Sequence, residues 1–237
     1  MERLDKIIAN RGIASRREVK ELLRQGRVLV DGVPASAPDV KVSAEKVAIT
    51  VDGVPVSGER YTYLLLHKPA GVLTATEDKH QPTVMELLPE SLRRRGLAPV
   101  GRLDKDTEGL LLLTDDGELT HRLLSPRYHV DKVYYAEVEG VPDAADAEAF
   151  ADGLLLEDGL QCLPAKLEPL GGDACLVTLR EGKFHQVKRM LASRGKPVRY
   201  LKRLSMGPLR LEDTLLPGQC RELSPEELAA VRSVCML

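Results

Sequence analysis

The segment Gly101-Arg102-Leu103-Asp104-Lys105-Asp106-Thr107-Glu108-Gly109 leads directly into four consecutive leucines, Leu110 to Leu113. An apolar run of this length, bounded by turn residues, predicts a strand that is buried on both faces. Asp104 would therefore lie on a loop anchored to the core, where catalytic groups are often held. Asp is also common in turns, because its carboxylate bonds nearby backbone amides, so the residue type alone leaves a structural role open.

The composition is that of a globular chain without membrane-spanning segments. Its 237 residues, 43% of them hydrophobic, suffice for one large domain or two and for a substantial core. No apolar run reaches the roughly 18 residues that cross a bilayer. The charged start Met1-Glu2-Arg3-Leu4-Asp5 lacks the apolar stretch of a signal peptide. We therefore expect a cytoplasmic protein that does not enter membranes.

Residues that commonly hold metals or cofactors do not cluster in the sequence. The four cysteines, at positions 162, 175, 220 and 235, form no C-x-x-C pair and lie beside no histidine cluster, which argues against a zinc site. Asp115-Asp116-Gly117 is more typical of a turn than of a metal site. The sequence contains neither a P-loop nor a dinucleotide-binding fingerprint. We expect no metal and no organic cofactor.

The net charge of −2 conceals three segments of unequal charge. Residues 1–30 contain eight Lys and Arg against four acidic residues, and residues 180–210 contain ten against one. Residues 136–175, in contrast, contain one lysine against ten acidic residues. Such a separation indicates one face for a polyanion and another for water. Ordinary solvated faces would give the same pattern, so charge alone does not establish nucleic-acid binding.

The N-terminal segment carries the local signals of two short helices and a hairpin. Apolar residues recur at helical spacing over positions 4–8, and Gly12 suits a left-handed helix C-terminus. Ser15 and Glu18 form a capping box that predicts the start of a second helix. Asp31-Gly32 is a hairpin turn signal.

The segment GRLDKDTEGLLLLTDDG resembles the catalytic motif of the pseudouridine synthases. Within that family it is closest to the branch that modifies ribosomal RNA, and to its small-subunit (RsuA) type. The resemblance covers essentially the whole chain. The Asp of G-R-L-D is the essential catalytic carboxylate of the family, which implies this role for Asp104. The preceding Arg102 is implied to fill the space that the target base leaves or to hold flanking phosphates.

Further family blocks add site residues by the same resemblance. Lys68 belongs to a K-P-x-G block, where a supporting role is implied, and Tyr134 belongs to K-x-Y, where it would pack against the target base. Lys188 aligns with the essential basic residue and is expected to pair with Asp104. Lys183 and Arg189 beside it are implied to contact RNA. His185 could pass for a general base, but we expect a structural or RNA-contacting role.

The block V-x-x-L-x-R at residues 198–203 completes the implied substrate site. Its leucine, Leu201, would line the uracil pocket, and its arginine, Arg203, would contact the substrate.

The pattern R-L-D-K…G-x-A-S-R-R-E…G-R-V-x-V-D-G resembles the α-L RNA-binding motif. That motif is a module of a ribosomal protein and of many RNA-modifying enzymes. The resemblance implies that basic residues in the first turn of the second helix lie against RNA phosphates, helped by neighbouring arginines. The residues at these positions are Arg16, Arg17 and Lys20, with Arg11 and Arg27 nearby. Contacts of this kind give affinity and register rather than sequence selectivity.

The implied architecture is α+β. It combines an RNA-binding domain over residues 1–59 with a catalytic domain over residues 60–237, built on a mainly antiparallel mixed sheet flanked by helices. Periodicity alone indicates only a mixed α/β class. The turn residues Asp52-Gly53 and Ser57-Gly58-Glu59 place the boundary between the domains near residue 60.

The implied function is isomerisation of a uridine in small-subunit ribosomal RNA by a monomer, after the base has turned out of its stack. Asp104 would be the ionised nucleophile or base, and a covalent adduct and a glycal-type intermediate both stay open. A large-subunit ribosomal RNA target is the first alternative, although a chain without a basic extension after Leu237 favours the small-subunit type.

Two alternatives belong to other functional classes. A non-catalytic RNA-binding assembly factor would be expected to lack part of the catalytic set, which is complete here. A metal-dependent nuclease would use the acidic residues Asp104, Asp106, Asp115 and Asp116.

Overall fold

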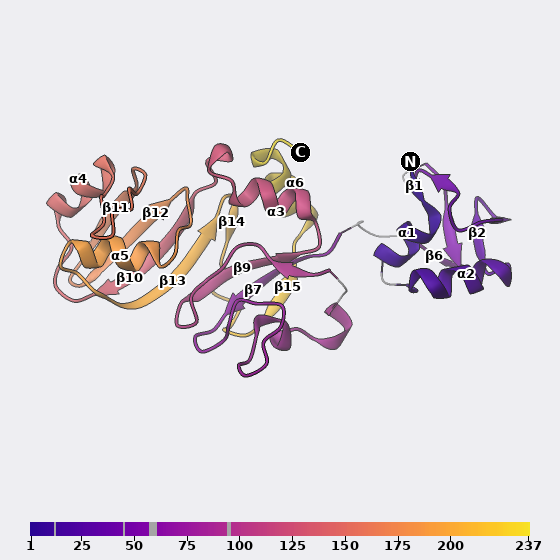
Figure 1. The fold of residues 1–237 in the computed structure, drawn as a ribbon, viewed down its shortest axis with the longest axis horizontal. Helices are drawn as coiled ribbons and strands as arrows, with labels where there is room; N and C mark the ends of the chain where they lie inside the picture. Colours follow the sequence, from indigo (N-terminus) through magenta and orange to yellow (C-terminus); the bar gives the residue numbers. More distant parts are fainter. Residues whose placement is uncertain (12, 45, 57–60, 94–95) are drawn as a thin grey trace. The chain divides into compact units, whose positions relative to one another are not determined.

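The computed structural model describes residues 1–11, 13–44, 46–56, 61–93 and 96–237 (Figure 1). The chain divides into two compact units, Met1–Thr62 and Tyr63–Leu237. Each unit has its own hydrophobic core. Gly12 and Ser57-Gly58-Glu59, for which we expected a helix C-terminus and a turn, lie outside the described residues.

The N-terminal unit packs the helices α1 (Leu4–Asn10) and α2 (Arg16–Arg24) against a small antiparallel sheet of order β3-β2-β5-β6. A separate two-stranded pair joins β1 and β4. The strands are Glu2–Arg3 (β1), Val28–Val30 (β2), Val33–Pro34 (β3), Lys41–Val42 (β4), Ile49–Val51 (β5) and Val54–Pro55 (β6).

Local signals in this unit fold as predicted. At the start of α2, the Glu18 amide donates to Ser15 Oγ at 3.3 Å, and the Ser15 amide donates to the Glu18 carboxylate at 2.6 Å. The capping box is therefore confirmed. Asp31 and Gly32 take φ values of 49° and 79°, and these left-handed conformations let the chain reverse tightly between β2 and β3.

The larger unit is built on one sheet, which has nine strands in the described part of the chain. Its main order is β11-β12-β10-β13-β9-β7-β15, with β14 added to β13 and β8 added to β9. The pairings are antiparallel except for the short parallel contact between β9 and β13. The strands are Tyr63–Lys68 (β7), Ala98–Pro99 (β8), Glu108–Thr114 (β9), Lys132–Val138 (β10), Lys166–Gly171 (β11), Ala174–Leu179 (β12), Val198–Met206 (β13), Leu209–Arg210 (β14) and Cys220–Glu222 (β15).

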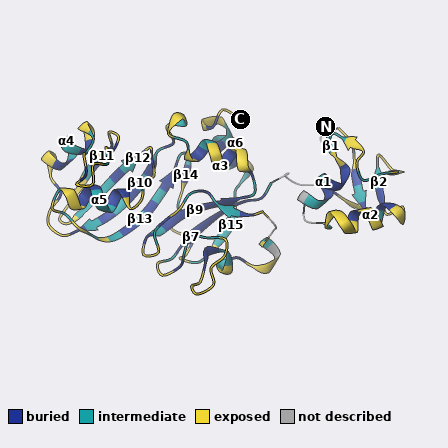
Figure 2. Cartoon of the chain, viewed as in Figure 1, coloured by how far each residue is buried: buried dark blue, intermediate teal, exposed yellow. Residues whose placement is uncertain are grey.

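The centre of this sheet explains the leucine run. Leu110 to Leu113 are fully buried within β9, as a strand covered on both faces requires. Strand β10, paired with β12 and β13, instead alternates, with every second residue buried, from Lys132 to Val138. Figure 2 shows the strands of this sheet mostly in the colours of buried and intermediate residues, with exposed residues on loops and helices.

Helices cover both ends of the sheet. Those near β10 to β13 are α4 (Ala144–Asp152), which contacts β11, and α5 (Gln186–Ser193), which contacts β13. At the other end, α3 (Gly117–Leu124) is linked to α6 (Pro225–Val234) by hydrogen bonds from Arg122 to the Cys235 and Met236 carbonyls. The α+β prediction is confirmed. Among the described residues, no helix combines the length and apolar character needed to span a membrane.

Candidate active site

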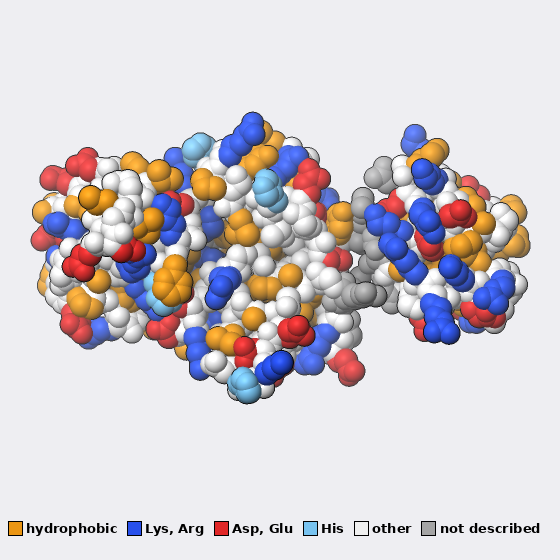
Figure 3. All heavy atoms as spheres, in the orientation of Figure 1, with side chains coloured by type: hydrophobic (Ala, Val, Ile, Leu, Met, Phe, Trp, Pro, Cys, Tyr) orange, Lys and Arg blue, Asp and Glu red, His pale blue; other side chains and the backbone are white. Residues whose placement is uncertain are grey.

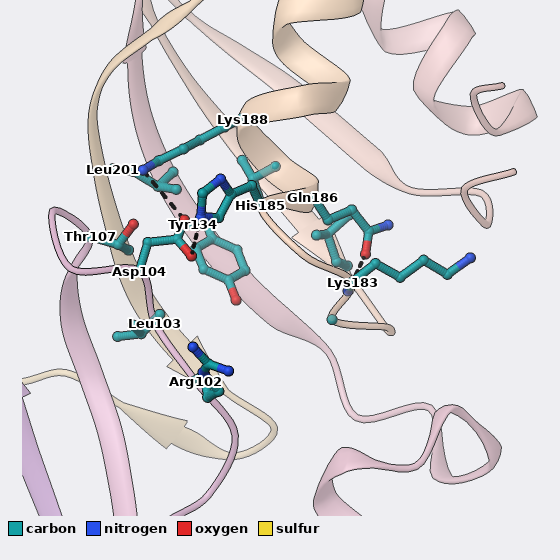
Figure 4. A pocket seen from close by; sticks show the side chains of 13 residues that line it. Arg102, Leu103, Asp104, Thr107, Tyr134, Lys183, His185, Gln186, Lys188 and Leu201 are labelled. Atoms are coloured by element: carbon teal, nitrogen blue, oxygen red, sulfur yellow. Dashed lines mark hydrogen bonds and ion pairs between the residues drawn. The ribbon is translucent and has the colours of Figure 1, made fainter. Parts of the chain in front are cut away.

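A pocket opens where the loop before β9 meets β10, β13 and the start of α5. Its walls come from residues far apart in sequence, which the sheet order brings together. The lining residues include Arg102, Leu103, Asp104, Thr107, Tyr134, Lys183, His185, Lys188 and Leu201 (Figure 4).

A buried lysine donates hydrogen bonds to the loop that carries Asp104. Lys68, at the end of β7, has no exposed surface, and its ammonium group donates to the Pro69, Lys105 and Thr107 carbonyls at 2.9, 3.2 and 2.9 Å. Burial lowers the pKa of Lys68 to about 8, partly offset by the nearby carboxylates. Lys68 therefore supports the loop, in keeping with the role implied by the K-P-x-G block.

A threonine fixes the same loop one residue before Asp104. Thr74 Oγ1 donates to the Leu103 carbonyl at 2.7 Å, and the Leu103 amide lies 3.2 Å from the same hydroxyl oxygen. Farther along, the Gly71 amide donates to the Lys105 carbonyl at 2.8 Å. These bonds span Asp104 on both sides, so its backbone position is fixed by the core.

Gly109 permits the close contact that brings the two halves of the site together. It pairs with Arg203 where β9 runs parallel to β13, and its φ is +107°. A Cβ at Gly109 would overlap the backbone of Arg203, lying 2.6 Å from its nitrogen. Only glycine fits this crossing, which places Asp104 at the β13 residues that line the pocket.

Asp104 lies between two nitrogen groups. Lys188 Nζ is 3.4 Å from Asp104 Oδ2, and His185 Nε2 is 3.4 Å from Asp104 Oδ1 (Figure 4). Lys188 Nζ also lies 2.5 Å from Asp106 Oδ1, and this hydrogen bond lowers the pKa of Asp106. The expected pairing of Lys188 with Asp104 is present, but it is shared with Asp106.

The pair of Asp104 and Lys188 is only partly buried. The Asp104 side chain is 26% exposed and that of Lys188 23% exposed. Loss of Lys188 would therefore not strand a fully buried charge, and the cost of about 3–5 kcal/mol that applies to deeply buried pairs is too high here.

Tyr134 and Leu201 form the apolar wall of the pocket. They lie on the adjacent antiparallel strands β10 and β13, where Tyr134 pairs with Arg203 and Ala136 with Leu201. Tyr134 and Leu201 are therefore diagonal neighbours across the two strands. Their side chains lie on the same face of the sheet and within reach of each other. They are 8% and 5% exposed, so a planar base entering the pocket would meet desolvated surfaces.

His185 is the site residue whose position the sequence analysis missed. It precedes α5 with a left-handed backbone, φ 50°, and its ring stacks on Phe184. It stands three residues before Lys188, and residues spaced i and i+3 at a helix start share a face. This spacing in the sequence could have predicted that His185 and Lys188 contact the same carboxylate.

Arg203 pairs with Tyr134 across β10 and β13, but its guanidinium is held in the interior. It is 2% exposed, its Nε donates to the Leu110 carbonyl at 2.7 Å, and it is not among the residues that line the pocket. On β13 it stands two residues beyond Leu201 and faces the interior. Its placement supports a structural role for the guanidinium rather than direct substrate contact.

Of the other implied residues of this region, Arg102 and Lys183 line the pocket and Arg189 does not. Arg102 is exposed beside Asp104. Lys183 lines the pocket edge, and its Nζ donates to the Gln161 carbonyl at 2.8 Å. Arg189 forms an ion pair with Asp158 at 2.5 Å.

Asp116, one of the acidic residues of the nuclease alternative, has a structural role. Asp116 caps α3 by accepting from the Glu118 and Leu119 amides, both at 3.1 Å, and it accepts from the Tyr63 hydroxyl. Within the residues that the structure describes, no three His, Cys, Asp or Glu side chains are grouped to hold a metal ion. The nuclease alternative therefore finds no support there.

Comparison with known proteins follows the division seen in the structure. The RNA pseudouridylate synthase family matches residues 62–193, more than half of the chain. The chain belongs to the RNA pseudouridylate synthase family. The S4 domain family matches residues 2–47, within the N-terminal unit.

Relatives of this pseudouridine synthase match it along nearly its full length. The protein named "Uncharacterized RNA pseudouridine synthase YtzG" of Bacillus subtilis is 47% identical, over 95% of this chain and 96% of its own. "Ribosomal small subunit pseudouridine synthase A" of Pseudomonas aeruginosa is 41% identical, over 97% and 100%. "Ribosomal large subunit pseudouridine synthase B" of Bacillus subtilis is 39% identical, over 99% and 97%.

A solved structure supports the same conclusion for this synthase. It is described as a crystal structure of pseudouridylate synthase and is 35% identical. The match covers 98% of this chain and 100% of that one, with a TM-score of 0.69.

The S4 domain of this synthase displays part of the predicted basic set on its surface. Arg16, Arg17 and Lys20 are exposed on α2. Arg27 instead bonds the Asp52 carboxylate through two nitrogens at 2.5 and 2.6 Å, and Arg11 donates to the Val56 carbonyl at 2.5 Å. Figure 3 shows Lys and Arg side chains gathered on one face of this unit.

Proposed function

We propose that this synthase isomerises a specific uridine of small-subunit ribosomal RNA to pseudouridine, with Asp104 as the catalytic carboxylate. One observation carries the proposal. Asp104 lies between Lys188 and His185 and shares a pocket with the apolar wall of Tyr134 and Leu201. A charged acid beside desolvated surfaces suits a reaction on a planar base attached to a sugar.

The chemistry conserves all atoms. The bond from the ribose anomeric carbon to uracil N1 breaks, the base turns, and a bond from the same carbon to uracil C5 forms. N1 gains a proton and C5 loses one, so no oxidant or reductant is required. Asp104 acts as nucleophile or base, with the Lys188 ammonium group 3.4 Å from its carboxylate. This arrangement is compatible with attack of Asp104 on the sugar and with attack of Asp104 on the base.

Access to Asp104 requires the uridine to leave its stack, because a base inside a helix cannot reach the pocket. Tyr134 and Leu201 would hold the extruded base between them. Arg102, exposed at the rim, would occupy the vacated space or hold a flanking phosphate. The S4 domain would add phosphate contacts through Arg16, Arg17 and Lys20.

The choice of target RNA rests on the relatives. The Pseudomonas aeruginosa relative named for the small subunit matches over its entire length at 41% identity. The Bacillus subtilis relative named for the large subunit is 39% identical. The second candidate is therefore a uridine of large-subunit ribosomal RNA, and the same experiment tests both.

Tritium release from RNA labelled at uracil C5 tests the reaction, because the isomerisation expels the C5 hydrogen. Small- and large-subunit transcripts and assembly intermediates are compared with the wild type, Asp104→Ala and the matched control Asp106→Asn. We expect release from small-subunit RNA with the wild type, none with Asp104→Ala, and most of it with Asp106→Asn. Wild-type turnover by Asp104→Ala would exclude the catalytic assignment. Release only from large-subunit RNA would exclude the proposed target.

A further inference from the structure

Phe184 places an aromatic ring in solvent next to His185, one of the residues that line the pocket. The chain contains two phenylalanines and no tryptophan. Phe150 is fully buried in the core, whereas Phe184 is 73% exposed. Burial of an aromatic ring is favourable, so an exposed ring beside an active site is a candidate binding surface.

Among the described residues, the ring stacked on Phe184 is that of His185. Its centroid lies 3.8 Å from that of the His185 ring, and the two planes differ by 18°. His185 in turn reaches Asp104 through Nε2. We call the face of the Phe184 ring that points away from His185 its outer face. The His185 imidazole lies between the Phe184 ring and the Asp104 carboxylate.

A buried polar clamp holds the loop that carries these rings. The Glu181 carboxylate, 5% exposed, accepts from the Leu163 amide at 2.8 Å and from Gln186 Nε2 at 2.6 Å. The side-chain oxygen of Gln186 accepts from the Lys183 amide at 3.0 Å. The exposed Phe184 ring thus belongs to a loop whose two ends, Glu181 and Gln186, are hydrogen-bonded to each other. A rigid aromatic surface loses little conformational entropy when a ligand binds.

The charge around the ring selects the ligand. The segment 180–210 contains ten Lys and Arg against one acidic residue, and that residue, Glu181, is buried in the clamp. Lys183, Lys188 and Arg189 flank the two rings in sequence. Each pairs with a carboxylate in the free protein, Lys183 with Glu181, Lys188 with Asp104 and Asp106, and Arg189 with Asp158, so an RNA phosphate would have to share or replace these partners. A flat apolar face within positive charge fits an unpaired nucleobase, whose ring stacks while its phosphates meet the cations.

We propose that the outer face of Phe184 stacks an unpaired nucleobase adjacent to the target uridine and so helps to select the RNA site. This inference rests on the proposed function, since it assumes that the uridine at Asp104 belongs to RNA. Phe184 is a binding residue and does not touch the reacting atoms. Its loss should therefore raise KM far more than it lowers kcat.

The first test replaces the flat ring while keeping an apolar side chain. Phe184→Leu should raise KM and the Kd for RNA by about 5- to 150-fold, the range found for loss of one stacked base, with little change in kcat. Phe184→Tyr, which retains a ring, should bind like the wild type. Equal KM values for Phe184→Leu and the wild type would overturn the proposal, while wild-type tritium release in the same assay would leave the proposed function intact.

A second test identifies the stacked base. RNAs that lack the base of a single nucleotide are made for each position flanking the target. At one position, base removal should weaken wild-type binding as much as Phe184→Leu does, and the two changes combined should cost no more than either alone. Additive losses at every flanking position would contradict a direct stack.

The third test reports stacking without turnover. Phe184→Trp supplies a tryptophan to a chain that has none, and its fluorescence should fall when RNA binds. Val141→Trp, at a position 62% exposed, is the matched control and should keep its fluorescence. Quenching by neither small- nor large-subunit RNA would overturn the proposal. Quenching by large-subunit RNA alone would keep it and reject the small-subunit target.

Discussion

The ammonium group of Lys68 donates a hydrogen bond to the Thr107 carbonyl at 2.9 Å, so the end of one buried strand supports the loop that precedes another. The same group bonds the Lys105 carbonyl, so its two bonds lie on either side of Asp106. A lysine with no exposed surface is costly, and here its donors satisfy loop carbonyls close to the active site.

Substitution of Lys68 should therefore affect both stability and activity. Lys68→Met removes the donor from three carbonyls, and we expect the free energy of unfolding to fall by about 1–3 kcal/mol. Turnover should fall as well, because the Asp104 loop loses its support. Urea unfolding and tritium release at a temperature where the variant is folded check both. A variant with wild-type turnover would show that the loop holds its shape without Lys68.

Lys188 should matter for chemistry more than for folding. Because its ion pairs are partly exposed, Lys188→Met should change the free energy of unfolding by less than about 1 kcal/mol. Turnover should fall on the order of 100-fold, the size expected when a charge that stabilises a reacting group is removed. Asp106→Asn, which removes the other partner of Lys188, is the control and should retain most activity. Equal losses in the two variants would assign the effect to the Lys188–Asp106 pair instead.

Tyr134 should act on the base after it has entered the pocket. Tyr134→Ala removes one wall, and we expect kcat/KM to fall on the order of tenfold or more, mostly through kcat. Tyr134→Phe keeps the ring and should keep RNA affinity. Single-turnover kinetics and filter binding separate the two quantities. A loss of affinity in Tyr134→Ala with an unchanged single-turnover rate at saturating RNA would indicate a role in binding alone.

Lys132 gives the unfolding free energy a defined pH dependence. Lys132 is 4% exposed, and burial, assisted by the nearby Arg203 charge, lowers its pKa from 10.5 to about 8. Between pH 8 and 10.5 the unfolded chain therefore holds a proton that the folded chain has released, so the contribution of Lys132 to stability rises with pH in this window. The gain totals about 3 kcal/mol.

The variant Lys132→Met lacks this titration. Its unfolding free energy relative to the wild type should therefore decline by about 3 kcal/mol as the pH rises from 7 to 10.5. Urea unfolding of both proteins at pH 7, 9 and 10.5 measures the difference. A difference that stays constant with pH would show that Lys132 keeps its proton in the folded chain.

The S4 domain should contribute affinity that depends on salt. Replacing Arg16, Arg17 and Lys20 together by Gln in the full chain should weaken RNA binding. The slope of log K against log salt should shrink by about 2, because each lost phosphate contact removes about 0.7–0.9. Lys166→Gln, in the acidic segment, is the control and should leave the slope unchanged. An unaltered slope in the triple variant would exclude phosphate contacts on α2.

Features set by neighbouring residues were predictable from the sequence. The capping box at Ser15 forms as expected. The burial of the leucine run in β9 also agrees with its pattern. Such features depend on hydrogen bonds that span three or four residues and on which face of an element meets the core. The family and its α+β fold followed from motif resemblance, which records such patterns in order.

The contacts between distant residues in the site were decided by tertiary structure alone. The sharing of Lys188 between Asp104 and Asp106, the approach of His185 to Asp104, and the burial of Arg203 all depend on the short parallel contact of β9 with β13. Gly109 and Arg203 are 94 positions apart, and no local periodicity encodes that they meet. The sequence thus determined which segments are strands, helices and turns. Only the packing of those strands into one sheet decided which charges face Asp104, because electrostatic contacts depend on distances in space and not along the chain.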